Sequence, residues 1–164
     1  MKTINKRAWK IVVSFLHLRL VYLPLILFVP LAHGAQSATA AETAALEVMD
    51  AFLTAFNASD EQAWADTLVY PHIRMASGQV RVYQDRNAFV EEMDMTAFAA
   101  NTGWRRSSWD DMEVIQSSPN KVHIRVKFSR FDAQDALIAS YDSLYIIEPV
   151  DGHWGVRARS SFAP

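Results

Sequence analysis

The chain has 164 residues, with 16 Lys and Arg residues, 18 Asp and Glu residues and no Cys. This length predicts a single folded domain, and a composition that is 51% hydrophobic and 21% charged excludes a disordered or fibrous chain. The lack of Cys excludes disulfides, thiolate catalysis, iron–sulfur clusters and Cys-based zinc sites.

The N-terminal segment has the layout of a secretory signal. Four positive charges within residues 2–10 precede an apolar run over residues 20–32. Ala32 and Gly34 then place small side chains at the −3 and −1 positions of a signal-peptidase site, which predicts cleavage before Ala35. We therefore expect an exported protein, periplasmic or secreted.

The apolar run admits a second interpretation, an uncleaved membrane anchor from about Ile11 to Leu31, which would be the chain's only membrane contact. Residues 1–34 hold five of the basic residues and none of the acidic ones. The rest of the chain therefore has 11 basic and 18 acidic residues, a net charge of −7 that disfavours nucleic acid and anionic lipid as partners. Residues 35–41 are a predicted short linker, and residues 42–164 are the predicted domain.

Three helices are predicted in the first half of that domain. A capping box over residues 39–42 opens the first helix, which extends to about Asn57. Its apolar side chains recur at helical spacing: Leu46, Met49, Phe52, Leu53 and Phe56. A second capping box at Ser59 opens a short helix that Pro71 ends. Asp85 is the predicted N-cap of the third helix.

Strands dominate the rest of the chain. A hairpin is predicted around Ser77-Gly78, and four longer strands follow Trp104, at about 105–116, 121–128, 137–148 and 154–162. In the last strand, alternation places Trp154, Val156, Ala158, Ser160 and Phe162 on one face. Arg157 and Arg159 then lie on the other face. Helices followed by antiparallel strands predict an α+β domain in which a sheet wraps a helix layer.

This order of elements resembles the nuclear transport factor 2-like superfamily, especially its SnoaL-like and ketosteroid-isomerase-like bacterial members, over Ala41 to Pro164. The resemblance lies in the phenylalanine stripe of the first helix, Ala63-Trp64-Ala65-Asp66, the short hairpin, the helix after Asp85-Arg86, and the meander ending in residues 152–157. It implies a cone, in which a curved antiparallel sheet closes on three helices around an apolar pocket. It also implies frequent homodimers through the outer sheet face.

Only some of the catalytic residues of ketosteroid isomerases have a counterpart in this chain. Those enzymes use an Asp base on the strand after the second helix, and residues 71–75 of this chain contain no carboxylate. They use a Tyr on the first helix, where this chain has Phe52 and Phe56. Asp142 is the nearest match to the protonated Asp of their oxyanion hole.

Asp142 and His72 are the candidate acid and base. Counting by twos places Asp142 on the same face as Leu144 and Ile146, so it faces the pocket if they face the core. The alternative is a position near the rim, or an ion pair with an arginine such as Arg74 or Arg125. An inward imidazole at His72 would be a general base near neutral pH.

Arg74 lies two residues after His72, so the two share a strand face, and Arg74 is a candidate to hold a carboxylate or enolate. The alternative for this pair is an exposed polar face, with Ile73 and Met75 pointing inward. Three tryptophans are candidate pocket walls or ordinary core residues: Trp64, Trp104 and Trp154. A basic stripe of His123, Arg125 and Lys127 is a solvated face or a surface for a partner subunit.

No cofactor is implied, and the scattered histidines give no metal-binding spacing. The sequence therefore leaves three hypotheses open. The first is an exported domain that binds a small, mostly apolar molecule in a cone-shaped pocket. The second is a proton-transfer enzyme, an isomerase, cyclase or dehydratase, that uses Asp142 and His72. The third is a non-catalytic dimerising module whose pocket is packed shut.

Overall fold

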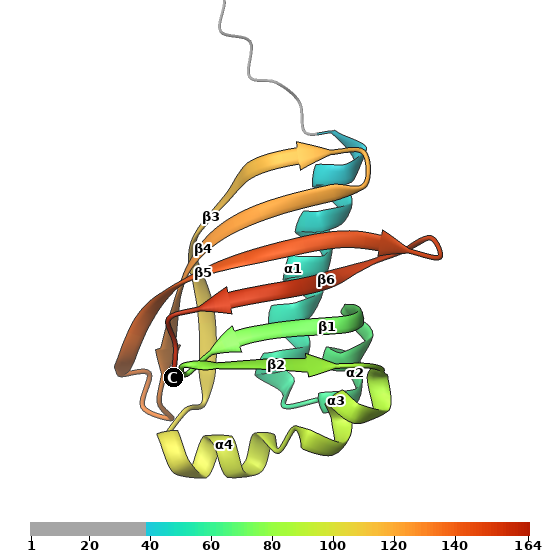
Figure 1. Cartoon of the computed structure of the whole chain (residues 1–164). Helices are drawn as coiled ribbons and strands as arrows, with labels where there is room; N and C mark the ends of the chain where they lie inside the picture. Colours follow the sequence, from blue (N-terminus) through green and yellow to red (C-terminus); the bar gives the residue numbers. More distant parts are fainter. Residues whose placement is uncertain (1–38) are drawn as a thin grey trace, which may run out of the picture. The chain divides into compact units, whose positions relative to one another are not determined.

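The structure is a computed structural model that describes residues 39–164 (Figure 1). Its helices are α1 (Ala40–Ala58), α2 (Glu61–Asp66), α3 (Arg86–Glu92) and α4 (Met95–Thr102). Its strands are β1 (Leu68–Ala76), β2 (Gln79–Tyr83), β3 (Arg106–Ser118), β4 (Lys121–Phe131), β5 (Leu137–Val150) and β6 (His153–Ser161). The predicted signal over residues 1–34 lies outside the described residues. Among residues 39–164, none of the helices combines the length and apolar composition needed to cross a bilayer.

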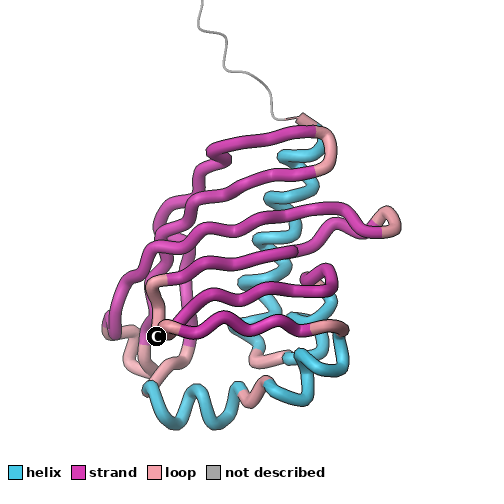
Figure 2. The backbone as a smooth tube through the Cα atoms, in the orientation of Figure 1, coloured by secondary structure: helices cyan, strands magenta, loops and turns pink. Residues whose placement is uncertain are grey.

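The six strands form one sheet in the order β2-β1-β6-β5-β4-β3. The sheet curves across α1, and the α3–α4 segment runs beside its β2 edge (Figures 1 and 2). The predicted α+β class, a curved sheet wrapped on N-terminal helices, is confirmed. Two details differ from the prediction: β1 pairs with β6 in parallel, and α4 is a fourth helix. This last helix was missed although Asp94 caps it and Gly103, with φ of 71°, ends it.

The capping box that opens α1 is confirmed. The Thr39 hydroxyl accepts a hydrogen bond from the Glu42 amide at 3.2 Å, and the Glu42 carboxylate accepts one from the Thr39 amide at 2.9 Å. Since α1 already begins at Ala40, the last two residues of the predicted linker are helical. The second cap differs by one position: Asp60, rather than Ser59, caps α2, because Ser59 has a left-handed conformation that ends α1.

Pro71 does not end a helix but lies within β1, after a cis peptide bond. The parallel contact between β1 and β6 requires a glycine at position 155. A Cβ atom there would lie 2.8 Å from the backbone carbon of Leu68 and 2.9 Å from a Val69 methyl carbon. The close approach lets the Val156 amide donate to the Thr67 carbonyl at 2.9 Å.

The hydrophobic core fills the space between α1 and the concave face of the sheet, which we call the inner face. It contains Met49 and Phe52 of α1 together with fully buried aliphatic side chains of the sheet: Val122, Ile124, Val126, Ile147 and Val156. The side chains of β4 alternate between the two faces of the sheet, with Val122, Ile124, Val126 and Phe128 inward. The opposite face of the sheet is the outer face.

A β-bulge in β6 reverses the predicted faces at the end of the chain. Val156 pairs with Ile147, but Ala158 pairs with Ile146, so Arg157 is an extra residue in β6. An extra residue shifts every later side chain to the other face. The predicted outward position of Arg159 is therefore wrong, because Arg159 pairs with the buried Tyr145 on the inner face.

Candidate functional site

A partly enclosed cavity of about 500 Å³ lies between the inner face of the sheet and the α3–α4 segment. We call it the arginine-lined cavity. Its walls come from α1, α2, β1, β2, β4, β6 and the α3–α4 segment, so it forms only when the whole domain folds. The lining residues that the site depends on are Phe56, Arg74, Phe98, Arg130 and Arg159.

Three arginines reach this cavity from three strands. Arg74 of β1 and Arg159 of β6 are register partners in the parallel pair, so they are neighbours on one face. Arg130 comes from the end of β4, two residues after the inward-facing Phe128. Continued alternation along β4 places Arg130 on the inner face, and the β6 bulge brings Arg159 to the same face.

Arg130 and Arg159 are buried among aromatic rings. Their side chains leave only 6% and 8% of their surface exposed. The Arg130 guanidinium lies 5.0 Å from the ring centre of Phe98, and that of Arg159 lies 5.5 Å from the ring centre of Tyr145. Such cation–π contacts offset part of the cost of taking a charge out of water.

Hydrogen bonds satisfy these two arginines only in part. Arg159 donates from a terminal nitrogen to the Ser161 hydroxyl at 3.2 Å. The Nε atoms of both Arg130 and Arg159 are buried and have no hydrogen-bond partner within residues 39–164. A buried donor without a partner is costly, so two of them beside one cavity are a strong sign of a site that is completed by something else.

The positive charges of the three arginines also repel one another, which makes the charged form of each less favourable. Burial lowers the pKa of Arg74 and of Arg130, and the positive charge of Arg159 lowers both further. Each of the two carboxylates that line the cavity already has another partner. Glu92 pairs with Arg81, and Asp94 accepts a hydrogen bond from the Ala97 amide at 2.7 Å to cap α4. The cluster of Arg74, Arg130 and Arg159 therefore keeps an uncompensated positive charge.

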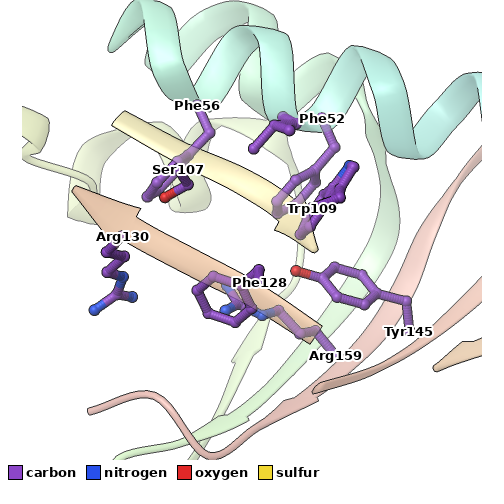
Figure 3. A pocket seen from close by; sticks show the side chains of 9 residues that line it. Phe52, Phe56, Ser107, Trp109, Phe128, Arg130, Tyr145 and Arg159 are labelled. Carbon is purple, nitrogen blue, oxygen red and sulfur yellow. The ribbon is translucent and has the colours of Figure 1, made fainter. Parts of the chain in front are cut away.

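The deeper end of the cone is filled by aromatic side chains. A small recess there has a volume of about 10 Å³, hardly enough for one water molecule. Figure 3 shows its lining, in which Phe52, Trp109, Phe128 and Tyr145 gather between α1 and the sheet. Arg130 and Arg159 line both hollows, so they lie at the floor of the arginine-lined cavity.

His72 faces the inside of the domain but lies outside the lining of the cavity. Only 3% of it is exposed, and its Nδ1 donates to the Val156 carbonyl at 2.9 Å. The ring also packs against Tyr83 and Phe89. Burial lowers the pKa of His72 to about 4, so the imidazole is neutral and structural at neutral pH. The alternative prediction, in which His72 belongs to an exposed polar face, is wrong because the side chain is buried.

Asp142 lies on the outer face. It is exposed and pairs in register with the exposed Lys127, whereas its neighbours Tyr141 and Ser143 face the arginines and the core. The predicted inward position of Asp142 is therefore wrong. Since His72 points into the domain and Asp142 out of it, one substrate atom does not reach both side chains.

The remaining candidates divide between cavity and core. Arg74 and Trp64 line the cavity, as the pocket interpretation of each requires. Trp104 is buried against Phe56 and donates from its indole nitrogen to the Ser107 hydroxyl at 3.0 Å. Trp154 lies in a shallow depression beside α1, away from the cavity.

Several charged side chains of the outer face are paired with one another. Arg125 binds Asp111 and Glu113 on β3, and the half-buried His123 lies within hydrogen-bond distance of Gln116 at 2.8 Å. This agrees with a solvated face for the basic stripe. Residues 39–164 contain no group of three or more His, Asp or Glu side chains placed to hold a metal ion.

Sequence reasoning missed Arg130 and Arg159 for different reasons. Arg130 lies two residues past the predicted end of its strand, and extending the alternation of Val126 and Phe128 would have found it. Arg159 had no local signal, because the bulge at Arg157 that turns it inward depends on the register with β5.

Comparison with known proteins gives a consistent result. The family model described as "NTF2-like protein (DUF6841)" matches residues 41–161. No curated protein matches the chain.

Three solved structures show the same fold at low identity. A protein of unknown function with a cystatin-like fold from Nostoc punctiforme has a TM-score of 0.63 at 12% identity, over 77% of this chain and 93% of that one. Aln2 from a Streptomyces species has a TM-score of 0.59 at 18% identity, over 74% and 89%. A ketosteroid isomerase-like protein from Erwinia carotovora atroseptica has a TM-score of 0.53 at 20% identity, over 74% and 96%.

Proposed function

Because the chain belongs to the NTF2-like protein family DUF6841, we propose that it is a small-molecule-binding domain whose ligand occupies the arginine-lined cavity. The membership confirms the resemblance to the nuclear transport factor 2-like superfamily. The observation that carries the proposal is the cavity itself. Its volume of about 500 Å³ lies in the range of ligand sites, roughly 300–1,000 Å³.

The walls favour a ligand with an apolar body. Phe56, Trp64, Met93 and Phe98 line the cavity and would cover a ring or a short hydrocarbon chain. The proton-transfer alternative loses support, because Asp142 and His72 point to opposite sides of the sheet. The packed-shut alternative describes only the deeper recess.

Binding can be tested with N-phenylnaphthylamine, an uncharged aromatic compound that fluoresces more strongly out of water. We expect saturable binding, weakened at least fivefold by Phe98→Ala, which removes one aromatic wall. Phe162→Ala is the matched control, because that ring is 85% exposed and lies outside the cavity. Absence of saturable binding to the wild type, or equal effects of the two variants, would contradict the proposal.

We also propose a homodimer through the outer face. Val80 and Val82 of β2 and Met75 of β1 are exposed there, and Val80 is 69% exposed and pairs in register with Met75. Neighbouring exposed apolar side chains are typical of an interaction surface. Sedimentation equilibrium should give a dimer for the wild type and a monomer for Val82→Glu. A monomeric wild type at micromolar concentration would contradict this proposal.

Export is the third part of the proposal and rests on the sequence of residues 1–34 alone. Expression of the full chain in a bacterium, followed by mass spectrometry of the purified product, should give an N-terminus at Ala35. A product that keeps residues 1–34 in the membrane fraction would favour the anchor.

A further inference from the structure

Three arginines give the arginine-lined cavity a concentrated positive charge. Arg74, Arg130 and Arg159 converge there, and none of the ion pairs among residues 39–164 includes any of the three. The pairs that are present involve other arginines and Lys121. A buried guanidinium is normally paired, because removing its hydration is costly.

Nearby groups do not neutralise the cluster. Arg81 lines the cavity together with the three clustered arginines, and two carboxylates do so as well. The side chains that line the cavity therefore have a formal net charge of plus two. Glu92 and Asp94, the two carboxylates, are bound by Arg81 and by a helix N-terminus respectively.

We propose that the ligand is an organic oxyanion, a carboxylate attached to an aromatic or similarly apolar body, and that Arg130 and Arg159 bind its charged group at the cavity floor. This inference rests on the proposed function and adds the ligand's chemical class. The guanidinium fork matches a carboxylate in two parallel hydrogen bonds. Both arginines line the cavity, and none of the ion pairs within residues 39–164 occupies their guanidinium groups.

The aromatic rings around the arginines are the reason for proposing that the carboxylate is attached to an apolar body. Arg130 lies against Phe98, Phe128 and Tyr141, and Phe98 also lines the cavity beside it. A fully hydrated inorganic anion would leave these rings without contacts. A carboxylate on an apolar body satisfies the guanidinium groups and covers the rings together.

The experiment compares naphthoate with naphthamide, which differ only in the charged group. Isothermal titration of the full chain should give at least tenfold tighter binding of naphthoate, since hydrogen bonds to charged groups are the stronger class. Arg130→Gln and Arg159→Gln should each weaken naphthoate at least tenfold and change naphthamide less than threefold. Arg125→Gln is the matched control, because it lies on the same strand as Arg130 but on the outer face.

A second measurement needs no variant. In arginine-labelled protein, the Nε–H resonances of Arg130 and Arg159 should shift on addition of naphthoate and stay in place with naphthamide. Inorganic phosphate is a further arm and should bind at least tenfold more weakly than naphthoate.

The outcomes separate the inference from the proposed function. Equal affinity for naphthoate and naphthamide, with both displacing N-phenylnaphthylamine, would overturn the oxyanion inference and leave small-molecule binding intact. Phosphate binding as tight as naphthoate would overturn the apolar body. Failure of all three aromatic compounds to bind would overturn the proposed function itself.

Discussion

The buried imidazole of His72 predicts a loss of stability in mild acid. Burial lowers its pKa to about 4 in the folded protein, against 6.5 for an unperturbed histidine. Between these values the unfolded chain binds a proton that the folded chain excludes. The stability that neutral His72 contributes above pH 6.5 is therefore lost as the pH falls towards 4.

The size of the effect follows from the two pKa values. Each pH unit within the window is worth at most about 1.4 kcal/mol, and the change between pH 7 and pH 5 is about 2 kcal/mol. Equilibrium urea unfolding measures this directly. With a slope of about 2 kcal/mol per molar urea, the midpoint should fall by about 1 M over that range.

Two variants isolate His72 as the cause. His72→Gln should remove most of the pH dependence between 7 and 5, whatever its effect on stability at pH 7. His123→Gln should retain it, because His123 is a half-buried side chain on the outer face rather than part of the core. An identical pH dependence in the wild type and His72→Gln, or an imidazole resonance of His72 that titrates near its usual value, would refute the reasoning.

Three further predictions concern stability. Phe52→Ala should lower the free energy of unfolding by about 3–5 kcal/mol in urea titrations, since the ring packs against three aromatic neighbours, and a change below about 1 kcal/mol would mean that α1 is not core. Gly155→Ala should cost about 1–3 kcal/mol by the same measurement, because its Cβ atom meets the backbone of β1 at Leu68, and an unchanged midpoint would contradict that close approach. Asp142→Asn should leave both the unfolding midpoint and N-phenylnaphthylamine affinity unchanged, and a loss of binding would place Asp142 at the cavity after all.

The buried guanidinium groups beside the arginine-lined cavity lower the stability of the fold, so their presence is better explained by a role in binding. Two nearly buried guanidinium groups, each with an unpartnered Nε–H, are retained beside an open space. Local arrangements of this kind cost folding free energy and are typical of functional sites. The site is therefore recognised by the buried, unpaired positive charge of its arginines rather than by a catalytic motif.

Local signals determined much of the fold. The capping residues Thr39 and Asp85, the helical spacing of Phe52 and Phe56, and the strict alternation within residues 121–128 each depend on side chains that lie close together in the sequence. Such patterns fix where a helix begins and which face of a strand is buried. That information is sufficient for the α+β class and for the superfamily.

Tertiary structure alone decided the site. Arg159 faces inward because a bulge against β5 shifts the register, and His72 is buried because Phe89 of α3 covers it. Asp142 faces outward because Tyr145, on the opposite face of β5, packs on Phe52 of α1. The sequence of a strand shows which side chains share a face. Which of the two faces is buried depends on the helices and strands that pack against it in the folded domain.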